Sequence, residues 1–365
     1  MRYLNYGMLV FIPIAILGRF LNWSPVLVFA TACLGIVPLA GWMGIATEEL
    51  AVHTGPRLGG LLNATLGNAA ELIITLVALR KGALNPELRD GLNELVKASI
   101  TGSILGNILL ILGLSILLGG LKNGTQRFNR RHAGVSSTML ILAVIALGIP
   151  SFFGHAIDAV NHQAVEYFSI SVALVMMIVY GLSVVYSLTD ADRSRGEEGE
   201  LPSEEIAHHA AGWPIRQALV VLVVATAFIA WLSEILVGAV EPVVTQLGIS
   251  EFFLGIILIP LVGNVAEHIV GVQVAIKNRM DLSLSISLGS SLQIALFVAP
   301  FLVFAGLLLG NPLTLIFNQF ELVALVGAVI IAALIALDGE SNWLEGAQLL
   351  VVYAIIGMAF FFLPT

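Results

Sequence analysis

Two glutamates in this 365-residue chain share a local sequence that is typical of a cation site. Glu71 ends the segment Gly-Asn-Ala-Ala-Glu, and Glu267 ends the segment Gly-Asn-Val-Ala-Glu. Asn68 and Asn264 stand three residues earlier, so in a helix each Asn–Glu pair would share one face. Ca²⁺ takes about six to eight oxygen ligands, and carboxylates and amides supply such oxygens. We therefore expect these four side chains to bind a hard divalent cation.

The same two carboxylates could also carry protons. Two like charges held close together in a low dielectric cannot both stay ionised after a cation leaves, so protons would take its place. Cation and protons would then exclude each other from one site, which is the requirement for antiport. His268 adjoins Glu267 and could be a further titrating group in this exchange.

Each of these features also has a simpler structural interpretation. A single glutamate inside a membrane can be a hydrogen-bonding residue, although two at matched positions, each with a matched asparagine, are harder to explain in this way. His268 could have a structural role alone. Pro260 has no N–H and leaves the carbonyl of Ile256 without its helical donor, which predicts either a further cation ligand or a plain kink.

The elements that position these residues must be membrane helices. Hydrophobic residues make up 58% of the chain and charged residues 11%, whereas soluble domains carry about 25% charged residues. The mean hydropathy is +0.98. This composition excludes a soluble enzyme and a disordered chain, and the single cysteine, Cys33, excludes a disulfide-stapled domain. The net charge of −8 argues against nucleic acid as a partner.

Eleven apolar segments approach or exceed the length of about 20 residues that a membrane-spanning helix needs. They predict an all-α polytopic membrane protein with about eleven transmembrane helices, at 4–21, 26–47, 58–79, 98–119, 135–153, 165–188, 216–239, 252–275, 283–309, 319–337 and 343–363. With a cytoplasmic N-terminus, eleven of the 16 Lys and Arg residues fall on the cytoplasmic side, as the positive-inside rule requires. A basic cluster at 80–97 opposes this orientation.

The two glutamate segments belong to an internal repeat. Residues 58–81 align with 254–277 at an offset of 196, and a Gly-Ser pair follows each copy, at 102–103 and 289–290. The copies fall in the third and eighth spans, so their starts are five spans apart and they face opposite ways across the bilayer, as in the inverted repeats of secondary transporters. Two inverted helices that cross at the midplane would bring both Asn–Glu pairs together. The predicted organisation is a first helix at 1–25, a five-helix half at 26–188, an acidic cytoplasmic linker at 189–215 and a second five-helix half at 216–365.

These segments closely resemble the Ca²⁺/H⁺ exchanger (CAX) family of the cation/Ca²⁺ antiporter superfamily. The resemblance rests on ATEELA at 46–51, GLLNATLGNAAELI at 60–73, LSEILVGAVEP at 232–242, GNVAEH at 263–268 and MDLSLSISLGSSLQIALFVAP at 280–300. It implies eleven helices in two inverted repeats, and export of Ca²⁺ in exchange for protons by alternating access. The family assigns cation binding to the residues that correspond to Glu71 and Glu267, with Asn68, Asn264 and His268 as further site residues.

The resemblance extends to residues outside the two motifs. The family's second motif segments line the same cavity and correspond here to Ser103, Ser290 and Gln293. The family often has an acidic segment between its halves that is thought to sense or recruit cation. It corresponds here to Glu197, Glu198, Glu200, Glu204 and Glu205, which could equally form a solvated linker. Four glutamates near span ends could line an ion path, act as proton relays or lie at the membrane interface: Glu48, Glu49, Glu234 and Glu241.

Other functions fit the sequence less well. An intramembrane hydrolase would need a motif such as His-Glu-x-x-His or Gly-x-Ser-x-Gly, and neither occurs. A passive cation channel could use carboxylates but needs no inverted pair of sites. The same fold could carry Mn²⁺, Na⁺ or K⁺, because Mn²⁺ uses much the same oxygen ligands. Related Na⁺/Ca²⁺ exchangers typically carry Gly-Thr-Ser-x-Pro-Glu, and the lack of any Gly-Thr-Ser favours protons over Na⁺ as the counter-ion.

We expect Ca²⁺ and protons as the transported ions, and neither a cofactor nor an enzymatic activity. Membrane lipids are expected partners, with anionic lipid near the cytoplasmic arginines Arg127, Arg130 and Arg131. Glu166 and Glu321 begin spans and are expected at the membrane interface. A homo-oligomer is compatible with the sequence. Short loops favour a bacterial or archaeal plasma membrane, with a vacuolar membrane as the alternative.

Overall fold

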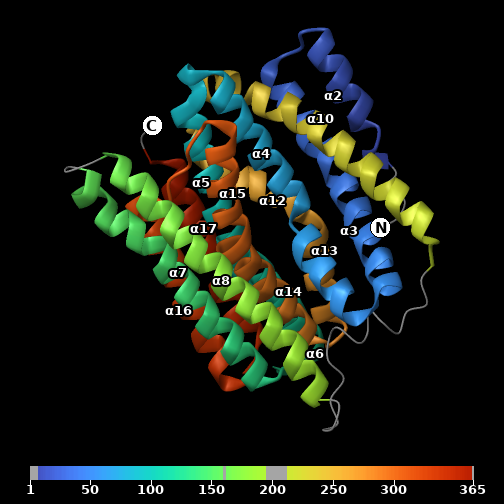
Figure 1. The fold of residues 1–365 in the computed structure, drawn as a ribbon. Coiled ribbons are helices and arrows are strands. Elements are labelled where there is room, and N and C mark those ends of the chain that lie inside the picture. The colour runs from blue at the N-terminus through green and yellow to red at the C-terminus, as the bar shows by residue number, and fades with distance from the viewer. Residues whose placement is uncertain (1–6, 159–161, 195–211, 364–365) are drawn as a thin grey trace. The chain divides into compact units, whose positions relative to one another are not determined.

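The computed structural model describes residues 7–158, 162–194 and 212–363, and this part of the chain is almost entirely helical (Figure 1). The α-helices are α2 (Phe11–Phe20), α3 (Pro25–Leu66), α4 (Ala69–Leu84), α5 (Arg89–Leu105), α6 (Leu112–Asn123), α7 (Arg130–Asp158), α8 (His162–Ser194), α10 (Ile215–Leu247), α11 (Glu251–Phe253), α12 (Ile259–Gly263), α13 (Val265–Ile276), α14 (Met280–Gln293), α15 (Ala299–Leu309), α16 (Gln319–Asp338) and α17 (Trp343–Phe361). A short 3₁₀ helix, η1 (Pro86–Leu88), precedes α5, and three π-helical stretches are η2 (Gly106–Ile111), η3 (Leu254–Leu258) and η4 (Ile294–Val298).

The helices coincide with the predicted spans and confirm a polytopic membrane fold. Within the described residues, eight helices are long and apolar enough to cross a membrane, or nine if a bent pair at Glu251–Ile276 is one span. The remaining two predicted spans also fall on helices. The first matches the shorter α2, and the third matches the end of α3 together with α4.

The chain divides into two compact units that differ from the predicted repeat halves. The first unit combines Met1–Ala78, Gly181–Glu251 and Val262–Ala266, and the second combines Leu79–Tyr180, Phe252–Leu261 and Glu267–Thr365. Each unit draws on both halves of the sequence. The division into repeat halves therefore stays a prediction, and the two units are described here separately.

Helix α3 is the centre of the first unit, and α2 and α10 both pack along it (Figure 1). Gly35 of α3 makes this close packing possible. A Cβ at Gly35 would lie 3.0 Å from the Leu232 side chain of α10 and 3.4 Å from the backbone N of Ile12 in α2. Small residues at such contacts allow membrane helices to approach each other closely.

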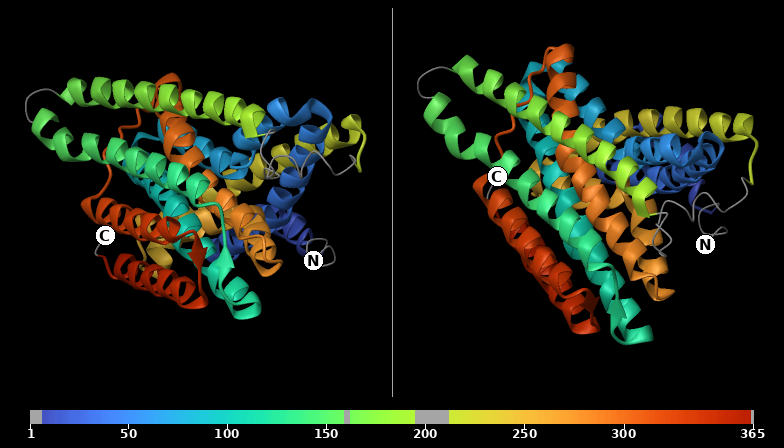
Figure 2. Two further views of the ribbon diagram at one scale, coloured as in Figure 1. Left: turned by 90° about the horizontal axis from the view of Figure 1, so that it is seen from below. Right: turned by 60° about the horizontal axis from the view of Figure 1, so that its bottom comes forward.

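The second unit contains two prominent helix pairs, α7 with α16 and α6 with α17 (Figure 2). Its two strands, β1 (Gln126–Arg127) and β2 (Glu340–Ser341), pair antiparallel beside the starts of α7 and α17. Helix α5 crosses η3 at very short distance. A Cβ at Gly102 would lie 2.6 Å from the carbonyl carbon of Ile256, and a Cβ at Gly255 would lie 2.7 Å from the carbonyl oxygen of Leu95.

Two of the π-helical stretches occur at matching places in the two predicted repeats. Stretch η2 begins three residues after Ser103, and η4 begins four residues after Ser290. Single π turns inside α-helices are frequently found at functional sites. The second motif segments of both repeats thus share this irregularity as well as their Gly-Ser sequence.

Candidate cation site

Both copies of the Gly-Asn-x-Ala-Glu segment lie at breaks between helices. A two-residue turn containing Asn68 separates α3 from α4, and a turn at Asn264 separates α12 from α13, with a bend of 63°. Glu71 and Glu267 then lie in the first turn of the new helix. We expected each Asn–Glu pair on one face of a continuous helix, and the structure corrects this. Each asparagine is at the N-cap position and each glutamate is the third residue of a helix.

Each break by itself places close together the chemical groups that a cation site requires. The N-terminus of a helix carries partial positive charge, which attracts carboxylates such as those of Glu71 and Glu267. The helix that ends before the break leaves its last carbonyl oxygens without helical donors. In transporters with discontinuous membrane helices, such carbonyl oxygens coordinate the transported cations. Each break therefore offers carboxylate, amide and carbonyl oxygens within a few residues.

In the first unit, the glutamate of one motif bonds to the asparagine of the other. The Asn264 Nδ2 donates to Glu71 Oε2 at 3.1 Å, although the two residues are 193 positions apart in the chain. Both side chains are buried, with 0% of Glu71 and 1% of Asn264 exposed. Gly263 permits this approach, because a Cβ there would lie 3.2 Å from the Glu71 Cβ. The expected meeting of the two motif copies is therefore present for this Glu–Asn pair.

The Asn-x-x-Glu spacing occurs twice more in the chain, where it forms capping boxes. Glu321 Oε2 accepts the backbone N–H of Asn318 at 2.7 Å, and Glu345 Oε2 accepts the backbone N–H of Asn342 at 3.2 Å. Such a reciprocal arrangement satisfies N–H groups that have no partner at a helix start. Glu71 differs from these two, because its carboxylate accepts an amide donor from a distant segment.

In the second unit, the carboxylate of Glu267 belongs to a chain of polar side chains. A side-chain hydrogen bond joins Glu267 to Ser290 of α14, and Asn107 Nδ2 donates to Ser290 Oγ at 3.1 Å. Within the described part of the chain, the buried Oε2 of Glu267 has no hydrogen-bond partner. Burying a carboxylate oxygen without a partner is costly, and a cation or a proton bound there would remove that cost.

Asn107 is a candidate site residue that our sequence reasoning missed. It lies in η2, is 2% exposed, and reaches Ser290 from the other repeat. A signal was present, because Gly106-Asn107 repeats the Gly-Asn pair that opens both glutamate motifs. We interpreted this stretch only through the Gly-Ser pair before it.

His268 follows Glu267 in the sequence and is buried, with 7% of its surface exposed. Within the described residues, neither of its ring nitrogens has a hydrogen-bond partner. A histidine that served a hydrogen-bonding role in the core would use at least one ring nitrogen. Its role as a titrating group stays a prediction.

The other residues of the second motif segments also lie in the second unit. Ser103 is buried near the end of α5, and Gln293 is partly buried at the end of α14. Ile256, whose carbonyl oxygen we considered as a ligand, packs that oxygen against Gly102 of α5. The structure therefore gives this carbonyl a packing contact with a neighbouring helix.

The four glutamates of the predicted ion path lie on α3 and α10 of the first unit. Glu48, Glu234 and Glu241 are exposed, and Glu49 is partly buried. Glu49 Oε2 accepts the backbone N–H of Trp213 at 3.1 Å, and His53 Nε2 lies 2.8 Å from the Trp213 carbonyl. The acidic segment with Glu197, Glu198, Glu200, Glu204 and Glu205 lies outside the described residues.

Glu321 is not an interfacial side chain, contrary to expectation. Only 2% of it is exposed, and its Oε1 accepts the Thr101 hydroxyl at 2.6 Å. Lys97, one helical turn before Thr101, donates to the Ile316 carbonyl at 3.0 Å. These contacts attach α5 to the start of α16 and to the segment before it.

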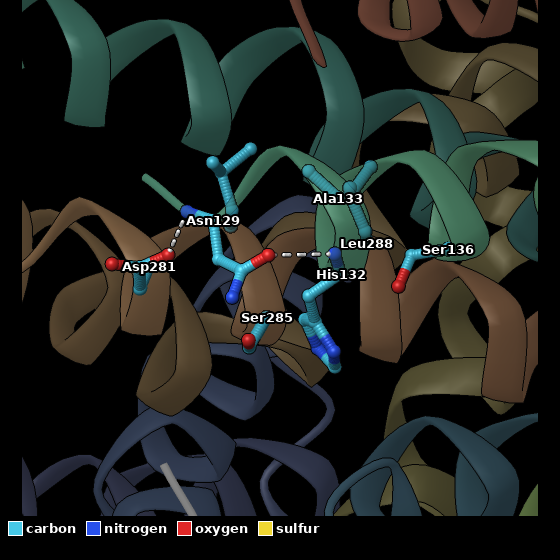
Figure 3. Close-up of a pocket in the computed structure, with 8 residues that line it drawn as sticks. Asn129, His132, Ala133, Ser136, Asp281, Ser285 and Leu288 are labelled. Carbon is cyan, nitrogen blue, oxygen red and sulfur yellow. Dashed lines mark hydrogen bonds between the residues drawn. The ribbon is translucent and has the colours of Figure 1, made fainter. Parts of the chain in front are cut away.

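A small cavity lies at one end of the second unit, between the start of α7 and α14 (Figure 3). Its volume is about 10 Å³, the size of one water molecule. Asp281 accepts the backbone N–H of Asn129, and the side-chain oxygen of Asn129 accepts the backbone N–H of His132. These hydrogen bonds fix the first turn of α7. The cavity is too small for an organic ligand.

Comparison with known proteins gives one consistent result. The model of the family described as sodium/calcium exchanger protein matches residues 24–189 and 217–362. The chain is 46% identical to a Ca²⁺/H⁺ antiporter of Aphanothece halophytica, with 98% of this chain and 96% of the relative covered. It is 40% identical to the Ca²⁺/H⁺ antiporter ChaA of Bacillus subtilis (strain 168), with 96% and 97% covered.

The fold matches a solved structure equally well. The structure of native YfkE superposes with a TM-score of 0.83 at 37% identity, and covers 99% of this chain and 100% of the other. The relatives match over nearly their whole lengths, and the family model spans both predicted halves. On these grounds, and with both glutamate motifs at helix breaks, the chain belongs to the sodium/calcium exchanger protein family.

Proposed function

We propose that this protein is a secondary transporter that exchanges Ca²⁺ for protons across a membrane. The observation that carries the proposal is the buried hydrogen bond from Asn264 to Glu71, which joins the two motif copies at their helix breaks. Relatives that share 40–46% identity over nearly the whole chain are named Ca²⁺/H⁺ antiporters. The proposal requires neither an enzymatic step nor a cofactor.

Glu71 and Glu267 are the proposed ligands of the transported cation, on the ground of their matched positions in the repeat. A carboxylate has about four lone-pair positions, so a carboxylate that accepts hydrogen bonds can also bind a cation. Glu267 contributes an oxygen that has no hydrogen-bond partner among the described residues. Asn68, Asn264, Ser290 and Asn107 are the neutral oxygen ligands, or they orient the carboxylates.

Coupling follows from competition for the same carboxylates. When Ca²⁺ leaves, protons bind to Glu71 and Glu267. The protein then changes conformation, so that the protonated site opens again to the side from which Ca²⁺ is taken up. Alternating access would expose the site first to one side and then to the other. The excess of Lys and Arg on one side predicts a cytoplasmic N-terminus, in a bacterial or archaeal plasma membrane or a vacuolar membrane.

The test is ⁴⁵Ca²⁺ uptake into proteoliposomes under an imposed pH gradient, compared with an imposed Na⁺ gradient. We expect uptake with the pH gradient alone. Glu71→Gln and Glu267→Gln should each abolish it, because glutamine keeps the volume and removes the titratable charge. Glu345→Gln is the matched control, since glutamine also serves in a capping box and Glu345 has this role.

Three results would contradict the proposal. Uptake driven by a Na⁺ gradient would mean that the counter-ion is Na⁺ and not the proton. Near-normal exchange in either motif variant would remove that glutamate from the site. Uptake of ⁵⁴Mn²⁺ without any uptake of ⁴⁵Ca²⁺ would replace the transported cation while leaving the fold and the exchange mechanism in place.

A further inference from the structure

An open groove of about 700 Å³ lies between α7 and α16 in the second unit. The two helices pack side by side (Figure 1), and both are apolar enough to span a membrane. Two consecutive arginines at the start of α7 line one end of the groove. Its other lining residues include Gly134, Val135, Thr138 and Leu337.

The arginines give this end of the groove a positive charge. Arg130 and Arg131 both have exposed side chains. The nearby Arg127 is already engaged, because it lies 3.7 Å from Glu340 in an exposed ion pair. Asp338, at the end of α16, is the acidic residue next in sequence to the groove residue Leu337. Asp281 is also near, because it accepts the backbone N–H of Asn129. The residues that line the groove nevertheless include both arginines and no carboxylate, so the groove surface itself is positive at this end.

The rest of the groove is apolar except for Thr138, whose hydroxyl donates to the Gly134 carbonyl at 2.9 Å. Val135 is 38% exposed and Leu337 is 50% exposed, so both keep a large apolar surface open. Gly134 contributes no side chain, and a Cβ built there would meet no atom within 4 Å. A charged end and an apolar channel along two membrane helices match the two ends of a phospholipid, its headgroup and its acyl chain.

We propose that this groove binds one anionic phospholipid, with its phosphate held by Arg130 and Arg131 and an acyl chain lying over Gly134 along α7 and α16. Arginine binds phosphate through two parallel N–H donors, which gives both affinity and a fixed orientation. Basic pockets between membrane helices bind anionic headgroups in this manner. The inference depends on the membrane fold alone, so it does not depend on which ions the protein exchanges.

The experiment counts lipid molecules retained by the purified protein. Protein in detergent is mixed with dioleoylphosphatidylglycerol or with dioleoylphosphatidylcholine, and native mass spectrometry measures binding of each. We expect one phosphatidylglycerol to bind more tightly than any phosphatidylcholine. Arg130→Ala/Arg131→Ala should weaken this binding about thirtyfold, from roughly fivefold per arginine near a membrane surface.

A second variant tests the apolar part of the groove. Gly134→Phe should fill the channel without displacing backbone and should abolish the bound lipid while both arginines remain. Two matched controls should bind as wild type does. Lys122→Ala/Lys277→Ala removes the same charge at exposed positions outside the groove. Gly181→Phe adds the same ring at an exposed glycine of α8 whose Cβ, like that of Gly134, would meet nothing within 4 Å.

The outcomes are distinguishable from those of the transport assay. Equal binding of both lipids, or equal loss in the lysine control, would overturn the proposal. Retention of phosphatidylglycerol by Gly134→Phe would place the lipid elsewhere. If the wild-type protein has the mass of a dimer and the Gly134→Phe variant has the mass of a monomer, then a second copy of the protein, and not a lipid, occupies the groove.

Discussion

Gly102 offers a sharp test of the structure, because its counterpart in the other repeat has a different environment. Gly102 precedes Ser103, as Gly289 precedes Ser290. A Cβ at Gly102 would lie 2.6 Å from the carbonyl carbon of Ile256 and 2.7 Å from its Cα, and closer still to its oxygen. A Cβ at Gly289 would meet nothing within 4 Å. The two glycines have the same sequence context, but in the structure only Gly102 is in close contact with another helix.

The expected effect of alanine at each position follows from these distances. Carbon atoms pack best at about 3.5–4.0 Å, so alanine at Gly102 would force α5 and η3 apart by about 1 Å. Overpacking of this kind costs roughly 1–3 kcal/mol, or more where backbone must move. Alanine in a helix interior gains up to about 1 kcal/mol over glycine. Gly102→Ala should therefore destabilise the protein by about 2 kcal/mol, while Gly289→Ala should be neutral or stabilising by up to about 1 kcal/mol.

The assay is thermal unfolding of both variants in the same detergent, with ⁴⁵Ca²⁺ exchange measured in parallel. Gly102→Ala should unfold at lower temperature than wild type, and Gly289→Ala should not. Gly106→Ala is a second control, because a Cβ there also meets nothing within 4 Å. If Gly102→Ala and Gly289→Ala unfold at the same temperature, the close crossing of α5 and η3 is absent and this reasoning fails.

Three further predictions follow from the polar contacts. Asn264→Ala and Glu71→Ala should be non-additive in a double-mutant cycle of stability, with a coupling of about 1–2 kcal/mol from their buried hydrogen bond; additive effects would mean that the bond does not form. Thr101→Val should cost about 2 kcal/mol by leaving a buried oxygen of Glu321 without its donor, whereas Thr245→Val on the exposed side of α10 should change the unfolding temperature little. Glu49→Ala should speed hydrogen exchange at the Trp213 amide about tenfold, from a bond of about 1.4 kcal/mol, and unchanged exchange, or the same increase in Glu241→Ala, would contradict this contact.

The sequence was sufficient to predict the membrane fold and the family. Long apolar segments identify membrane helices because each must satisfy its backbone hydrogen bonds internally. The matched Glu71 and Glu267 motifs were visible because a charged residue inside a span is rare and costly. Neither inference depends on knowing how the helices pack.

The helix breaks were also encoded in the sequence, but we interpreted the pattern differently. Asn-x-x-Glu is a capping-box spacing, and we interpreted Asn68 and Glu71 as neighbours on a continuous helix. The hydropathy of the surrounding span concealed the break. The burial of Glu321 could not be predicted from one sequence, because it depends on the hydroxyl of Thr101, 220 residues away.

The four Asn-x-x-Glu segments suggest how such a site could arise during evolution. An intramembrane helix break needs a cap, and the residues that make a good cap, an amide and a carboxylate, are also hard-cation ligands. Duplication of the gene, with the second copy inserted into the membrane in the opposite orientation, would then supply two such sets of ligands. Redesign of ion selectivity at Glu71 or Glu267 therefore has to preserve helix initiation as well as charge, and substitutions that retain both functions form a much smaller set than those that retain charge alone.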